Sequence, residues 1–118
     1  MALNAALRGQ EKGAEGSFET TALPVALKKG MGITAMKIFA QDALVGQASA
    51  EKLIHYSMSL PVASAVIGMP KVEHIEQNVA AAKAFKPLPA DEKKRMSDEL
   101  SAKNRLALDH FYRNHIDA

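Results

Sequence analysis

The segment with the clearest binding chemistry runs from Ile67 to Asn78. An apolar run ends at Ile67, Gly68 permits close approach of another group to the backbone, and a helical pattern begins at about Val72. Free backbone N–H groups and the positive end of the helix dipole then face the carboxyl edge of a sheet, where Lys71 adds positive charge. This geometry binds phosphate. On spacing alone, however, an ordinary βα loop is the stronger interpretation, because such loops are common.

Other residues that could bind an ion carry weaker signals. Lys37 is a charge within an apolar run, which fits either an anion contact or a lysine that extends past the rim of a sheet. The histidines are scattered, and His110 and His115 are five residues apart rather than the four of a helical metal pair. His55 and His74 fall on separate predicted helices. We therefore predict no metal site.

Composition limits the classes of function. The chain has 118 residues, of which 47% are hydrophobic and 24% charged, so one globular domain is expected. A net charge of +2 gives no reason to expect a nucleic-acid partner. The absence of cysteine excludes disulfide scaffolds, iron–sulfur clusters and cysteine nucleophiles. Neither a signal peptide nor a transmembrane span is recognisable, so we expect no membrane partner and a soluble, cytoplasmic protein.

The elements that must position these residues alternate between helix and strand. Apolar periodicity and capping signals predict helices at 17–29, 50–59 and 72–84, strands at 32–39 and 62–67, and a last helix from Asp91. Pro24 lies inside the first helix, so the helix either starts there or is kinked. A strand, a helix and a second strand within about 35 residues form a parallel βαβ unit.

The predicted sheet is too small to stand alone. Two clear strands, with a third at 1–4, cannot form a sheet core covered on both faces, and their edges would be open to pairing with another chain. We therefore expect part of a larger α/β fold, with self-association through the open sheet edges.

Several motifs together resemble the C-terminal part of the aldo/keto reductase family. The resemblance runs in order over about residues 1–90 and is loose in the tail. Its motifs are Asn4, Ser17-Phe-Glu19, Leu23-Pro-Val-Ala26, Lys28-Lys-Gly-Met-Gly-Ile33, Ala35-Met-Lys37, Tyr56-Ser-Met-Ser-Leu-Pro61, Val66-Ile-Gly-Met69 and Glu76-Gln-Asn78.

The resemblance implies a fold and a cofactor. The family folds as a (β/α)8 TIM barrel and uses NADPH or NADH to reduce carbonyls. Residues 1–90 would then contribute strands six to eight of an incomplete barrel, and residues 91–118 a helical tail, together a single partial domain. The segment after residue 67 would lie where such barrels usually bind phosphate, which makes phosphate binding the stronger interpretation.

Site residues follow position by position. The resemblance places the cofactor pyrophosphate beside the loop after strand seven and the adenosine end beside the loop and helix after strand eight. Met69 and His74 stand where NADPH-preferring members often carry Lys and Arg, so the choice between NADH and NADPH is open, with Lys71 nearby. The implied cofactor-binding residues are Met36, Lys37, Ile38, Phe39, Gly68, Met69, Lys71, His74, Gln77 and Asn78.

The family's catalytic Asp, Tyr, Lys and His lie on strands two to four, and this chain has no counterpart of those strands. Tyr56 and Tyr112 fall on predicted helices outside that motif. The leading hypothesis is a C-terminal fragment of an aldo/keto reductase-like oxidoreductase that binds cofactor but is inactive alone. The alternatives are a stand-alone or dimeric module that binds nucleotide or phosphate, and a non-functional truncated gene product.

Overall fold

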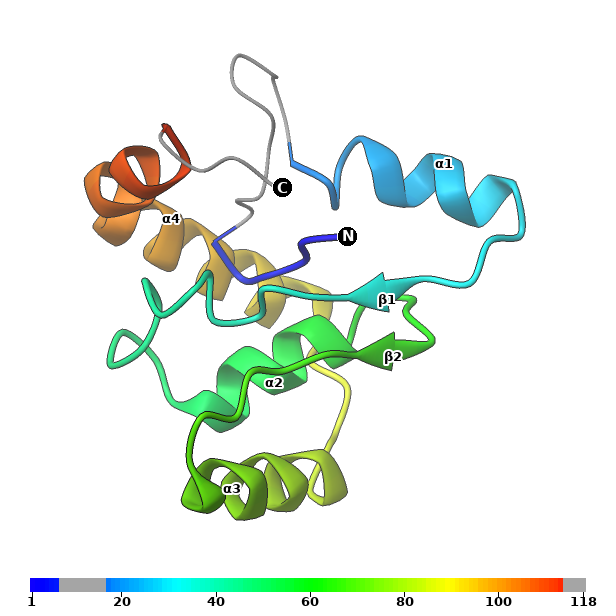
Figure 1. The fold of residues 1–118 in the computed structure, drawn as a ribbon. Coiled ribbons are helices and arrows are strands. Elements are labelled where there is room, and N and C mark those ends of the chain that lie inside the picture. Colours follow the sequence, from blue (N-terminus) through cyan, green and yellow to red (C-terminus); the bar gives the residue numbers. More distant parts are fainter. Residues whose placement is uncertain (7–16, 114–118) are drawn as a thin grey trace.

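Helices and short strands alternate along the chain. The computed structural model describes residues 1–6 and 17–113, and it describes side chains as far as residue 103. The side chains of His110, Tyr112 and His115, which the sequence analysis considered, lie outside the described side chains. In chain order the elements are α1 (Ala22–Lys28), β1 (Thr34–Ala35), α2 (Ala50–Met58), β2 (Ser64–Ala65), α3 (Val72–Lys83) and α4 (Ala90–Arg113), as shown in Figure 1.

The strands are parallel, as the βαβ pattern predicts. Thr34 of β1 is opposite Ser64 of β2, and Ala35 is opposite Ala65. On the other side of β1 the N-terminal segment runs in the same direction: Leu3 N–H donates to Met36 O (3.1 Å), and Met36 N–H donates to Met1 O (3.0 Å). Three extended segments therefore lie side by side, with β1 in the middle.

The strands are shorter than their sequence pattern predicts. The predicted strands 32–39 and 62–67 contain regular pairing only at Thr34–Ala35 and Ser64–Ala65. Lys37 has a left-handed backbone (φ 55°), which turns the chain out of the extended conformation. In the described part of the chain no segment pairs with the second edge of β2, so half of its hydrogen-bonding groups have no ladder to join.

The first helix begins later than predicted. Residues 17–21 form a turn in which Thr21 N–H donates to Ser17 O (2.9 Å), and α1 starts at Ala22. Pro24 therefore lies in the first turn of α1, where a missing N–H costs no hydrogen bond. By contrast, Ser49 caps α2 as predicted, because its Oγ accepts from Lys52 N–H (3.2 Å).

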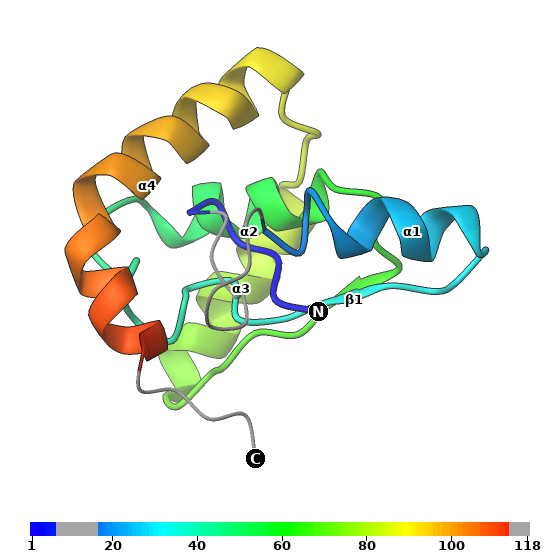
Figure 2. The same cartoon turned by 90° about the horizontal axis from the view of Figure 1, so that it is seen from above.

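Helix α2 is the centre of the packing. It lies against the strands on one side and against α3 on the other, as Figures 1 and 2 show. Ser57 on α2 is fully buried and donates to Leu3 O (2.8 Å), which ties the helix to the N-terminal segment. The largest fully buried side chains are Leu3, Asn4, Ile38, Leu44, Leu53, Ile54, Tyr56 and Ser57.

The apolar stripe of α3 faces outward. Helical spacing groups Val72, Ile75 and Val79 on one side of this helix, yet their exposed fractions are 69%, 45% and 45%. Helix α3 packs on α2 through its opposite side, where Ala81 is buried. Leu27 of α1 is also exposed. In the residues described, no helix is long and apolar enough to cross a membrane.

Candidate nucleotide-binding pocket

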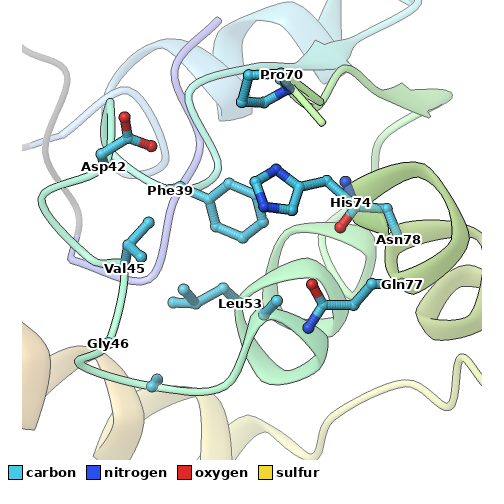
Figure 3. A pocket seen from close by; sticks show the side chains of 12 residues that line it. Phe39, Asp42, Val45, Gly46, Leu53, Pro70, His74, Gln77 and Asn78 are labelled. Atoms are coloured by element: carbon cyan, nitrogen blue, oxygen red, sulfur yellow. The ribbon is translucent and has the colours of Figure 1, made fainter. Parts of the chain in front are cut away.

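A pocket of about 130 Å³ lies at the carboxyl ends of both strands. One wall is the loop that follows β1, the floor includes the first turn of α2, and the other wall is the loop after β2 with the first turns of α3 (Figure 3). Ligands of open parallel sheets bind at this edge, where the chain leaves successive strands. The lining residues are Phe39, Asp42, Val45, Gly46, Ala48, Ala50, Leu53, Gly68, Pro70, His74, Gln77 and Asn78.

The loop after β1 holds its wall in a tightly turned backbone. Lys37, Ala40, Gln41 and Asp42 all have positive φ, a conformation that is uncommon for residues other than glycine. Hydrogen bonds stabilise it: Ala40 N–H donates to Lys37 O (2.8 Å), and Leu44 N–H donates to Phe39 O (3.1 Å). Asn4 Nδ2 also donates to Lys37 O (3.3 Å). The Phe39 ring is therefore presented from a fixed turn.

The α3 wall is positioned by a buried histidine on α2. His55 Nε2 lies 2.8 Å from Ala81 O, and because a carbonyl only accepts, Nε2 carries the proton. The same imidazole meets the Phe85 ring edge-on, with centroids 5.4 Å apart and planes at 78°. These contacts fix the rotation of α3, so that His74, Gln77 and Asn78, at helical spacing, all line the pocket.

The Asn78 amide is the most informative group in the pocket. Its side chain is only 6% exposed, and its Nδ2 has no hydrogen-bond partner. A buried donor without an acceptor costs about 1–3 kcal/mol. Figure 3 shows the Asn78 and Gln77 amides turned toward the pocket. The structure thus leaves a buried donor without an acceptor beside the pocket.

The chemistry of the lining suits a flat heteroaromatic ring. Phe39 supplies a ring face, and stacking on an aromatic side chain contributes about 1–3 kcal/mol per nucleobase. Asn and Gln amides pair with the adjacent donor and acceptor on the adenine edge. The volume is close to that of an engineered cavity of about 150 Å³ that binds benzene, so the pocket has room for one ring system and not for a whole dinucleotide.

The structure brings together five of the ten residues implied by the resemblance. Phe39, Gly68, His74, Gln77 and Asn78 line the pocket. The other five do not. Ile38 is 2% exposed and belongs to the hydrophobic core, Met36 and Met69 are exposed, Lys37 is half-buried, and Lys71 is the exposed residue that precedes α3.

Sequence reasoning placed only Phe39 on the wall formed by the loop after β1. Asp42, Val45, Gly46 and Ala48 complete that wall but carry no motif of their own, and Pro70, on the other wall, was missed as well. The available signal was topological, since parallel strands deliver both of their following loops to one edge of a sheet. Gly46 lies in the first of these loops, and a glycine at this place in the sequence indicates a turn. In the structure its φ is 77°.

Tyr56 is not placed for chemistry on a substrate. It is 2% exposed, and its hydroxyl donates to Glu19 Oε2 (3.0 Å). Burial raises the pKa of Tyr56, and the Glu19 carboxylate raises it further. In the part of the chain that the structure describes, no group of three His, Asp or Glu side chains could hold a metal ion.

Comparison with known proteins adds no relative: no family model, curated protein or solved structure matches the chain. The resemblance to aldo/keto reductases gains no support from this result and stays a prediction. The pocket is therefore interpreted from its own geometry and chemistry.

Proposed function

We propose that this chain binds the adenosine end of a nicotinamide dinucleotide, NADH or NADPH. The single observation that carries the proposal is Asn78, which lines a ring-sized pocket and whose buried amide Nδ2 has no hydrogen-bond partner. The adjacent Gln77 amide and the Phe39 ring supply the other two contacts that an adenine ring uses, an edge partner and a stacking face.

We propose further that the chain acts as the C-terminal part of an aldo/keto reductase-like carbonyl oxidoreductase. Three parallel segments, with the pocket at their carboxyl ends, are the arrangement expected of strands six to eight of a TIM barrel. Catalysis would need a tyrosine acid beside a lysine in the pocket, and neither is among the described residues that line it. The chain alone is therefore proposed to bind cofactor without reducing carbonyls. We propose separately that it resides in the cytoplasm.

A second candidate is a dimeric nucleotide-binding module. The exposed Val72, Ile75 and Val79 on α3, with exposed Val66 just after β2, favour it, because a second copy covering them would remove apolar surface from water. Both candidates use the same pocket. They differ in whether a second copy of the chain or the rest of a barrel covers the apolar surface.

Calorimetric titration with NADH and NADPH, alongside thermal melts, tests the proposal. We expect saturable binding of at least one cofactor and a melting temperature that rises with its concentration. The variant Asn78→Leu should lose binding while the free chain becomes no less stable, because the substitution removes an unpaired buried donor at similar volume.

Ser97→Ala provides the matched control. Ser97 Oγ, on α4, is the other buried side-chain atom without a hydrogen-bond partner among the described residues, and it does not line the pocket. Its removal should leave cofactor affinity unchanged. Wild-type protein that binds neither cofactor, or an Asn78→Leu variant that binds as well as wild type, would contradict the proposal.

A further inference from the structure

The charges that face the pocket are unusual for a site that receives a phosphorylated ligand. Among the described residues that line it, Asp42 is the one carboxylate, His74 is the one imidazole, and neither Lys nor Arg is present. Lys71 follows Pro70 in the chain but lies outside the lining and is exposed. Phosphate groups in proteins are ordinarily held by Arg, Lys or clustered backbone N–H groups.

Asp42 lies on the wall opposite the α3 amides. Figure 3 shows its carboxylate across the pocket from Gln77 and Asn78, on the loop that follows β1. Its backbone is left-handed (φ 73°), and its carbonyl accepts from Val45 N–H (3.0 Å). The turn thus fixes the backbone from which the exposed Asp42 side chain extends into the wall of the pocket.

We propose that Asp42 makes this pocket selective for adenosine whose ribose 2′-oxygen carries no phosphate, and hence for NADH over NADPH. The inference rests on the proposed function. With adenine against Phe39 and the α3 amides, the ribose extends toward the remaining polar wall, where a carboxylate accepts a hydrogen bond from a sugar hydroxyl. A phosphomonoester there carries about −1.5 to −2 charge at pH 7 and is repelled by Asp42.

Adenosine 5′-monophosphate and adenosine 2′,5′-bisphosphate isolate this difference, because they share every other group. We expect titration of the full 118-residue chain to show that the monophosphate binds at least about tenfold more tightly than the bisphosphate. NADH should likewise bind more tightly than NADPH. Asp42→Asn should reduce the preference to about threefold or less, since asparagine keeps the size of the side chain and tolerates left-handed backbone.

Asp91→Asn is the charge-matched control. Asp91 is exposed at the start of α4 and outside the pocket lining, so this variant should keep the wild-type preference. Equal or tighter binding of the bisphosphate by wild type would overturn the inference and leave the proposed function standing. An Asp42→Asn variant with unchanged preference would overturn the role of Asp42. Binding of none of the four ligands would overturn the proposed function and the inference together.

Discussion

At the scale of single residues, Glu19 and Tyr56 form a partly buried pair outside the pocket. The Tyr56 phenol donates to the Glu19 carboxylate from α2 to the turn before α1. Burial raises the pKa of Glu19 above its ordinary 4.5, while the hydrogen bond from Tyr56 and the charge of Lys93 oppose that rise. Ser97 favours the ionised form of the phenol, although its Oγ lacks the geometry of a hydrogen bond.

We expect Glu19→Gln to change how stability depends on pH. A carboxyl whose pKa is raised in the folded state contributes stability below its unfolded pKa and loses it as pH rises through the folded value. The variant keeps an acceptor for Tyr56 but has no charge to desolvate. Urea unfolding should therefore show the free energy of unfolding of the variant increasing relative to wild type as pH rises from 4 toward 7. The increase should start near the ordinary carboxyl pKa of 4.5. A difference that is flat across this range would contradict the argument.

Phe39 is expected to act on the ligand rather than on the fold. Its ring is only partly buried, and it lines the pocket. Phe39→Leu keeps most of the apolar volume but removes the stacking face, which should weaken cofactor binding by about 1–3 kcal/mol. Titration measures the loss, and a melt without ligand shows whether the fold is retained. Unchanged affinity would exclude stacking on this ring.

At the scale of elements, the joint between α2 and α3 connects stability to the site. His55→Leu removes the hydrogen bond to Ala81 O and the edge contact with Phe85, at a cost of about 1–2 kcal/mol. Because α3 carries His74, Gln77 and Asn78, a loosened joint should also weaken cofactor binding, although His55 does not line the pocket. Unfolding and titration together measure both effects.

Ser57→Ala is the comparison for that joint. It removes a buried hydrogen bond of the same length, to Leu3 O, but on the side of α2 that faces the N-terminal segment. A similar loss of stability with unchanged binding is expected. If both variants weakened binding equally, general destabilisation rather than the position of α3 would be the cause.

At the scale of the whole molecule, association is predicted by the exposed apolar face of α3 and by the edge of β2 that no described segment pairs with. Apolar surface of this kind is removed from water when two copies meet. The double variant Ile75→Lys, Val79→Lys should shift sedimentation toward the monomer at high protein concentration. Its melting temperature should change little in dilute solution, since both side chains are already exposed. A wild type that stays monomeric would contradict this prediction.

Local signals determined much of the chain. Ser49 as the cap of α2, the start of α3 at Val72 and the tail helix near residue 91 follow from capping groups and periodicity, which act over a few residues. The parallel direction of the strands follows from the helix between them. Sequence signals also located the pocket wall formed by Gly68 and α3, because these residues are continuous in sequence.

Tertiary packing determined the features that no local sequence signal specifies. The left-handed backbone at Lys37 shortened β1 and put Ile38 into the core, although apolar character alone had marked 32–39 as a strand. Packing through Ala81 turned the apolar stripe of α3 outward, because a helix buries the face that meets its neighbour. Asp42 and Asn78, 36 positions apart in the sequence, face one pocket only because two parallel strands end at the same edge, and no spacing rule encodes that meeting.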